Sequence, residues 1–150
     1  MWYNPIILWL LRSPLHGFMS KSTMIISYKG RKSGKTYSTP INYWVMPSGD
    51  ELMLITTSQR SRSWWRNFRQ EAPLELRIRG RDLKGRAIAV EDEAKVAEIL
   101  GELFRQAPQM GRYYKVGIRK DGQPNAEDIR RAAQERIVVK IYLVDGKIPG

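Results

Sequence analysis

The chain of 150 residues contains no cysteine and a single histidine, His16. Without cysteine it can form no disulfide scaffold, no thiolate nucleophile and no zinc site built from thiolates. One histidine argues against a multi-histidine metal site and leaves little for a Ser-His-Asp triad. We therefore expect no metal ligands, and we expect the chemistry to depend on something other than the usual nucleophiles.

Long apolar runs are also missing. The run from Ile6 to Leu11 is far shorter than the ~20 residues that a membrane-spanning helix needs, and no basic segment or cleavage site marks it as a secretory signal. The sequence thus favours a cytoplasmic protein. Residues 1–22 are interpreted as an apolar helix on the core or a flap over a pocket. Their aromatic residues leave peripheral membrane contact through residues 2–21 as an alternative.

Acidic residues are absent from the first 49 positions, which hold six Lys or Arg. Residues 50–89 carry a net charge of +4, and residues 90–150 carry +1, out of +11 for the whole chain. The excess of positive charge therefore lies in the first 89 residues, where we expect an anionic partner. Nucleic acid, an anionic membrane and a phosphorylated cofactor are the candidates.

The length and the absence of repeats and linkers predict one domain over residues 1–150. Alternating and β-branched patterns predict strands, and the spacing of apolar residues predicts helices. The expected strands are 23–28, 37–46, 52–57, 74–79, 86–90 and 137–143, and the expected helices are a short one near 64–68 and longer ones at 92–106 and 126–136. Turns at 30–34 and 47–50 predict a meander of neighbouring antiparallel strands, and Pro40 predicts an edge or a bulge. About six short, mostly antiparallel strands with flanking helices indicate an α+β fold containing a small barrel.

The strongest local motif is the turn Gly30-Arg31-Lys32-Ser33-Gly34-Lys35. Glycines allow a ligand to approach the backbone, exposed N–H groups form an anion-binding nest, and the cations add charge, a combination that suits a phosphate. A Walker A loop is excluded, because three residues rather than four separate the two glycines and a strand follows instead of a helix. A solvated basic hairpin turn is the alternative.

A second motif runs from Ser58 to Trp65 and leads from a strand into a helix N-terminus. Ser61 or Ser63 is expected to cap that helix, whose N–H groups favour an anion. Trp64 and Trp65 are adjacent, so we expect one to pack in the core while the other is free to form the wall of a flat site.

A third motif is the series of cations Arg77, Arg79, Arg81, Lys84 and Arg86. Alternation places several of them on the solvent face of a hairpin, which is consistent either with a solvated face or with a site for nucleic acid. Aromatic residues are not interleaved with these cations, as stacking platforms for nucleic acid require, so nucleic acid is not the favoured partner.

Taken together, residues 24–76 resemble the deazaflavin-dependent nitroreductase family, whose members have an FMN-binding split-barrel fold and use coenzyme F420. The resemblance rests on the basic turn, on Ser38-Thr39-Pro40-Ile41-Asn42-Tyr43, on Thr56-Thr57-Ser58 and on Trp64-Trp65-Arg66-Asn67-Phe68 with Ala72-Pro73. It departs from many relatives in the loop Gln59-Arg60-Ser61-Arg62, where those relatives have a glycine.

The resemblance implies a cofactor with a flat tricyclic ring, a phosphate and an anionic oligoglutamate tail. Its phosphate would be held by the turn residues Arg31, Lys32, Ser33, Gly34 and Lys35, and its ring would lie beside Pro40, Thr57, Ser58 and Trp64. Tyr113 and Tyr114 would correspond to the tyrosines of the substrate pocket and are the candidate catalytic residues.

The function implied is reduction of a small quinone-, nitro- or enone-type acceptor by a hydride from reduced F420. The cofactor would carry the difficult chemistry, which agrees with the absence of ordinary catalytic residues. The alternatives are an FMN-dependent split-barrel reductase, a non-catalytic flavin or heme carrier and a basic nucleic-acid-binding barrel. Both a monomer and a homodimer are compatible with the sequence.

Overall fold

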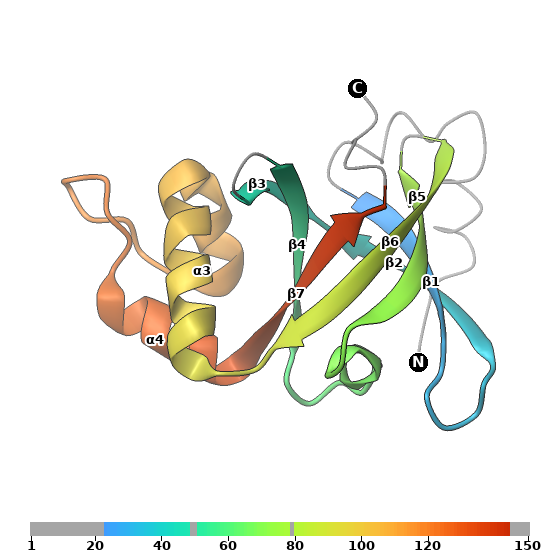
Figure 1. Cartoon of the computed structure of the whole chain (residues 1–150). Helices are drawn as coiled ribbons and strands as arrows, with labels where there is room; N and C mark the ends of the chain where they lie inside the picture. The colour runs from blue at the N-terminus through green and yellow to red at the C-terminus, as the bar shows by residue number, and fades with distance from the viewer. Residues whose placement is uncertain (1–22, 49–50, 79, 145–150) are drawn as a thin grey trace. The chain divides into compact units, whose positions relative to one another are not determined.

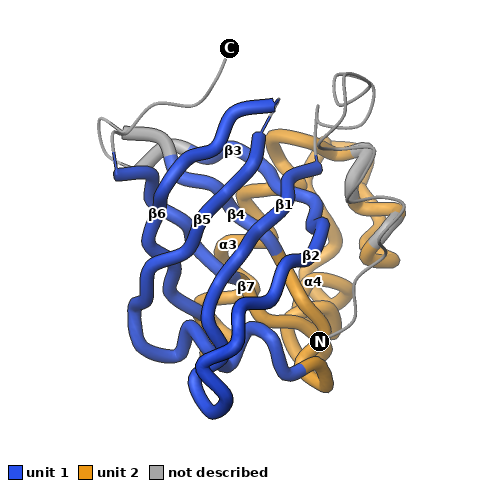
Figure 2. The backbone as a smooth tube through the Cα atoms, turned by 90° about the vertical axis from the view of Figure 1, so that its right-hand side faces the viewer, with its two compact units in different colours: residues 1–56, 63–89, 139–150 blue, residues 57–62, 90–138 orange. Residues whose placement is uncertain are grey.

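The structure is a computed structural model that describes residues 23–48, 51–78 and 80–144. The chain divides into two compact units, drawn in blue and orange in Figure 2. Unit 1 contains residues 1–56, 63–89 and 139–150, and unit 2 contains residues 57–62 and 90–138. His16, the apolar segment 2–21 and Arg79, which the sequence analysis singled out, lie outside the described residues.

The described residues contain one sheet of seven strands, whose order is β2-β1-β5-β6-β7-β4-β3 (Figure 1). The strands are β1 (Thr23–Lys29), β2 (Thr36–Asn42), β3 (Trp44–Ser48), β4 (Glu51–Gln59), β5 (Ala72–Ile78), β6 (Arg81–Val90) and β7 (Arg136–Leu143). The pairs β1–β2, β1–β5, β3–β4 and β5–β6 are antiparallel.

The two edge strands of this sheet follow each other in the chain. Only Tyr43 separates the end of β2 at Asn42 from the start of β3 at Trp44, so these ends lie within about 7.6 Å of each other. A flat sheet of this size would hold its edges about 29 Å apart, given strands 4.8 Å apart. The sheet is therefore curled, and with the helices it forms the predicted α+β, split-barrel-like fold.

The strand predicted at 37–46 proves to be two strands at opposite edges of the sheet. The predicted meander is therefore wrong at this point, because β2 pairs with β1 while β3 pairs with β4. The prediction for Pro40 is confirmed: it lies in edge strand β2, opposite Ile25, where the N–H that proline lacks is least needed.

Strand β5 has the predicted alternation. Leu74, Leu76 and Ile78 are buried, whereas Glu75 is exposed. The turn that follows is shorter than predicted, because Ile78 already pairs with Arg81 and β6 begins at that residue. Gly80, with φ at 79°, supplies the left-handed conformation that this tight turn requires.

Two α-helices belong to unit 2, and both begin where the sequence predicts. Helix α3 (Glu93–Gln106) is capped by the Asp92 carboxylate, which accepts a hydrogen bond from the backbone N–H of Lys95. Helix α4 (Ala126–Glu135) is capped by Asn125 in the same way. The segment predicted as loop before α4 contains the 3-10 helix η2 (Pro108–Tyr114).

Among the described residues, no helix combines the length and the apolar character that crossing a bilayer requires.

Candidate functional site

The basic turn 30–35 lies beside a short 3-10 helix, η1 (Trp64–Phe68), and together they line a hollow of about 270 Å³ in unit 1. Its lining comes from the turn, from two tyrosines of the flanking strands and from the start of η1. The residues are Tyr28, Gly30, Arg31, Lys32, Ser33, Tyr37, Ser63, Trp64, Arg66 and Asn67. The structure thus brings together four of the residues predicted to bind a cofactor, namely Arg31, Lys32, Ser33 and Trp64.

The turn closes on itself through its backbone. The Gly30 N–H donates to the Lys35 carbonyl at 2.8 Å, and the Gly34 N–H donates to the Gly30 carbonyl at 2.9 Å. Gly34 has φ at 67°, and the Lys35 N–H donates to the Ser33 hydroxyl at 3.2 Å. Gly34 and Lys35 therefore shape the turn and do not line the hollow, so direct contact of these two with a cofactor stays a prediction.

Asn67 joins the turn to η1. Its Oδ1 accepts a hydrogen bond from the Arg31 N–H at 2.8 Å, and its Nδ2 donates to the Trp64 carbonyl at 2.7 Å. The Arg31 guanidinium also donates to the Arg66 carbonyl at 3.3 Å. The Asn67 amide thus uses its oxygen to hold the turn and its nitrogen to bond to the backbone of η1. Residues 31 and 67 are far apart in the sequence, so no local pattern predicted this contact.

The helix at this site differs from the predicted one. It is a 3-10 helix of five residues, and Ser63 occupies the N-cap position without a side-chain hydrogen bond to the backbone. Such a short helix has little macrodipole, so the capped helix N-terminus that the sequence predicted cannot be the main attraction for an anion. The positive charge at the hollow comes instead from the side chains that line it.

The hollow presents donors and cations. Among the described residues, Arg31, Lys32 and Lys35 form no ion pair with a carboxylate. Arg66, which sequence reasoning did not single out, contributes a buried Nε that has no hydrogen-bond partner. A buried donor without a partner costs free energy, so an acceptor that reaches this Nε would be bound favourably.

Aromatic rings form the apolar side of the hollow. Trp64 is only 6% exposed and meets Phe68 edge-on, with ring centroids 6.3 Å apart. Tyr28 contacts the same Phe68 ring at 5.4 Å, and burial, with a smaller contribution from Tyr37, raises the pKa of Tyr28. Trp65 does not line the hollow and lies against the guanidinium groups of Arg66 and Arg69.

Other predicted residues belong to unit 2, where Thr57 and Tyr114 meet. Their hydroxyl oxygens are 2.9 Å apart, a hydrogen bond in which either group can donate. Ser58 is buried, and its hydroxyl donates to the Gln59 carbonyl. The Tyr113 side chain lies outside the described part of the chain. Contacts of Pro40, Thr57 and Ser58 with a cofactor ring stay predictions.

Tyr114 is held by neighbours from three elements. Besides Thr57 of β4, its ring packs against Phe104 of α3 at 5.3 Å and lies beneath the Arg136 guanidinium of β7 at 4.6 Å. Burial raises the pKa of Tyr114, while the Thr57 hydrogen bond and the Arg136 charge lower it in part. The phenol is therefore protonated at neutral pH and can serve as a proton donor.

The loop that departs from the family pattern also has a defined role. The Arg60 guanidinium donates to the carbonyls of Ala133, at 2.8 Å, and Glu91, at 2.7 Å. Its backbone N–H donates to the Glu135 carbonyl at 3.0 Å. Arg60 thus satisfies carbonyls at the end of α4 and before α3.

The comparisons with known proteins show the family of the chain. A family model described as F420H(2)-dependent quinone reductase matches residues 15–120. The chain belongs to this family. The description of this family agrees with the expected enzyme class, a deazaflavin-dependent oxidoreductase, and with the expected cofactor, coenzyme F420.

The fold has a counterpart among solved structures. A crystal structure of the protein Atu2129 from Agrobacterium tumefaciens, of unknown function, is similar with a TM-score of 0.51 and 12% identity. The match covers 93% of this quinone reductase family member and 60% of the Agrobacterium protein. No curated protein sequence matches the chain.

The hollow of unit 1 fits the anionic part of the family's cofactor. The side chains of Arg31, Lys32 and Arg66 offer only donors to it, the Ser33 hydroxyl can donate as well as accept, and Arg66 Nε is a buried donor without a partner among the described residues. A Cβ on Gly30 would lie 2.7 Å from a ring carbon of Tyr37, so the turn can pass this ring only as glycine. These features suit a phosphate group.

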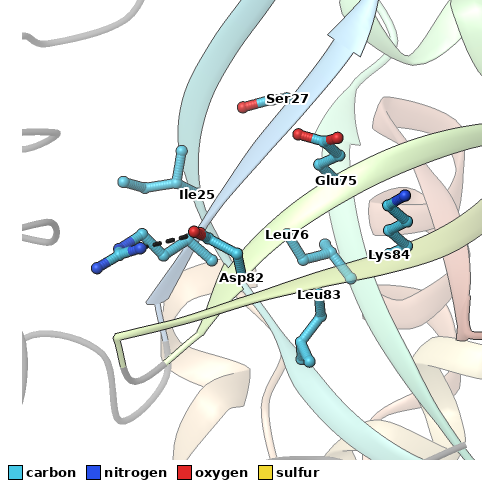
Figure 3. A pocket seen from close by; sticks show the side chains of 8 residues that line it. Ile25, Ser27, Glu75, Leu76, Asp82, Leu83 and Lys84 are labelled. Carbon is cyan, nitrogen blue, oxygen red and sulfur yellow. Dashed lines mark hydrogen bonds and ion pairs between the residues drawn. The ribbon is translucent and has the colours of Figure 1, made fainter. Parts of the chain in front are cut away.

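A second hollow of unit 1 has a different character (Figure 3). It lies over β1, β5 and β6, and two cations and two carboxylates line it: Arg77, Lys84, Glu75 and Asp82. Arg77 pairs with Asp82 at 2.9 Å, and Lys84 lies opposite Glu75 in the strand register. The two cations and two carboxylates of this lining balance in charge, so this part of the basic series is poorly suited to nucleic acid.

Proposed function

We propose that this protein is a reductase that uses F420H2 to reduce a quinone-, nitro- or enone-type acceptor. Family membership supports the cofactor and the general reaction. The observation that carries the proposal is the hollow of unit 1, where a basic turn is hydrogen-bonded to η1 and offers cations that have no carboxylate partner in the described part of the chain.

In this proposal the cofactor phosphate is bound by Arg31, Lys32, Ser33 and Arg66. Asn67 holds the turn so that these donors converge before the cofactor arrives, which lowers the entropy lost on binding. Trp64 provides an apolar wall on the same hollow, where a flat ring can pack. Lys35, beside the turn, adds positive charge for the anionic tail.

The acceptor requires a proton as well as electrons. When bound, reduced deazaflavin supplies a hydride. We propose that Tyr114 supplies the proton from its phenol oxygen to an oxygen of the acceptor and regains one from water. Thr57 donates to the phenol oxygen as negative charge develops there, because its hydroxyl is already within 2.9 Å.

Binding of the cofactor is the direct test. Titration with oxidised F420, followed by fluorescence, should give a Kd in the micromolar range or below, and FMN should bind more weakly. Replacing both Arg31 and Lys32 by alanine should raise the Kd for F420 at least about a hundredfold, since each charged hydrogen bond contributes about 1.5–3 kcal/mol.

The matched control is Arg81→Ala with Lys84→Ala. It removes the same charge from exposed positions on the same unit, away from the hollow, and should leave the Kd nearly unchanged. An equal loss in both double variants would mean that net charge alone attracts the cofactor. Absence of binding to F420 and to FMN would overturn the proposal.

The acceptor class is tested by turnover. Oxidation of F420H2 is followed by absorbance with a water-soluble quinone, a nitroaromatic compound and an enone, each at matched concentration. We expect turnover with the quinone, in line with the family description. Tight F420 binding without turnover on any of the three would instead favour a carrier.

A further inference from the structure

Arg136, the first residue of β7, is a half-buried cation in unit 2. Among the described residues it forms no ion pair. Its side chain is half-buried, and its guanidinium lies over the ring of Tyr114, 4.6 Å from the ring centroid. Arginine in a half-buried position usually pairs with an acid, so its placement on a tyrosine face calls for a physical explanation.

The backbone on both sides of this contact is fixed. The Arg136 N–H donates to the Ala132 carbonyl and ends α4. Lys115, directly after Tyr114, has a left-handed conformation with φ at 57°, and its carbonyl accepts a hydrogen bond from Arg131 at 2.7 Å. The backbone that carries the guanidinium and the backbone next to the phenol are therefore both tied to α4.

Two further neighbours of the phenol are uncharged. Thr57 of β4 bonds to its oxygen, and Phe104 of α3 packs against its ring. Arg136 of β7 is the charged side chain among these three contacts. A cation over the face of a phenol stabilises the phenolate more than the neutral ring, because the ionised ring carries more negative charge.

We propose that Arg136 is a positioning residue that fixes the Tyr114 ring and stabilises the negative charge left on it when Tyr114 gives up its proton. The inference rests on the proposed role of Tyr114 as proton donor to the acceptor. The O–H bond of Tyr114 breaks, the proton goes to the acceptor oxygen, and the electron pair stays on the phenol, whose ring lies beneath the guanidinium. Burial keeps the phenol protonated beforehand, and Arg136 limits the cost of its ionisation.

The test compares Arg136→Met, which keeps the apolar stem and removes the charge, with Arg136→Lys, which keeps the charge. Ionisation of Tyr114 is followed in the protein without substrate by ultraviolet absorbance or by NMR of labelled tyrosine, and Tyr114→Phe identifies its signal. Arg136→Met should raise the pKa of Tyr114 by about half a pH unit or more. Arg136→Lys should restore most of the difference.

Turnover gives the second measurement. Arg136→Met should lower kcat with the quinone by about threefold to tenfold while the Kd for F420 stays unchanged, and Arg136→Lys should recover part of the rate. If the role of Arg136 were purely structural, kcat and the melting temperature would fall together in both variants. An unchanged titration of Tyr114 in Arg136→Met would overturn the inference.

The two proposals fail in different ways. If Tyr114→Phe reduces the quinone as fast as the unmodified protein, proton donation by Tyr114 is wrong, and with it any role of Arg136 in turnover. If Tyr114→Phe reduces the quinone slowly, while Arg136→Met has an unchanged Tyr114 titration and an unchanged kcat, Tyr114 keeps its role and the inference about Arg136 is wrong.

Discussion

Two glycines of the basic turn are required for different physical reasons. At Gly30 a Cβ would lie 2.7 Å from a ring carbon of Tyr37, so space is the constraint. At Gly34 nothing lies within 4 Å of the added atom, but φ is 67°. The sequence motif gives no reason to distinguish the two glycines. The structure shows that Gly30 is required for lack of space and Gly34 for its backbone conformation.

Substitutions at Gly34 test this distinction. Gly34→Ala should lower the free energy of unfolding by about 1 kcal/mol, because alanine disfavours the left-handed region, whereas Gly34→Asn should cost clearly less. Chemical denaturation measures both. Equal losses in the two variants would show that backbone conformation is not the cause.

At the scale of secondary-structure elements, the Arg60 side chain links the last turn of α4 to the segment before α3 by hydrogen bonds. Arg60, which follows β4, donates through its guanidinium to carbonyls at the end of α4 and before α3. Terminal helical carbonyls lack partners within the helix, so a guanidinium that reaches two segments stabilises both. The loop that departs from the family's glycine pattern therefore has a structural role in unit 2.

Replacement of Arg60 by methionine should lower the free energy of unfolding by about 1.5–3 kcal/mol, the usual contribution of charged hydrogen bonds. Arg62→Met is the control, because this side chain is exposed and has no hydrogen-bond partner among the described residues; its effect should stay within about 0.5 kcal/mol. The measurement is again denaturant unfolding. Similar losses for both arginines would contradict the assigned contacts.

At the scale of the whole molecule, the charge of +11 is concentrated before residue 90. The structure divides these cations into two groups. Those of the turn 30–35 form no ion pair among the described residues, and neither do Arg81 and Lys84, whereas Arg77 and Arg86 of the strand series pair with Asp82 and Glu71. The turn is therefore one place where positive charge without an acidic partner is available to a ligand.

This division predicts a salt dependence. Raising the ionic strength from about 0.05 M to about 0.5 M should weaken F420 binding severalfold, because screening reduces attraction between partly exposed charges. FMN carries a phosphate without the oligoglutamate tail, so its affinity should fall less. Fluorescence titrations at several salt concentrations measure both, and an F420 affinity independent of salt would contradict the role of the turn.

Local patterns in the sequence were sufficient for most elements. Alternating residues in 74–78 predicted β5, and the spacing of apolar residues in 92–106 predicted α3, because these signals depend on neighbours one to four residues apart. The basic turn was recognisable for the same reason. The sequence also pointed to the family through the order of these local motifs, and the family model confirmed it.

The tertiary structure alone decided which distant residues meet. Separation of β2 and β3 to opposite edges depends on closure of the curled sheet, and no pattern within residues 36–48 expresses it. Three contacts join residues that are 22 to 57 positions apart in the sequence. They are the hydrogen bond from Arg31 to Asn67, the Thr57–Tyr114 hydrogen bond and the contact of Arg136 with the Tyr114 ring. Such contacts form only when folding brings these segments together, so composition and spacing predict the ingredients of the site but not its partners.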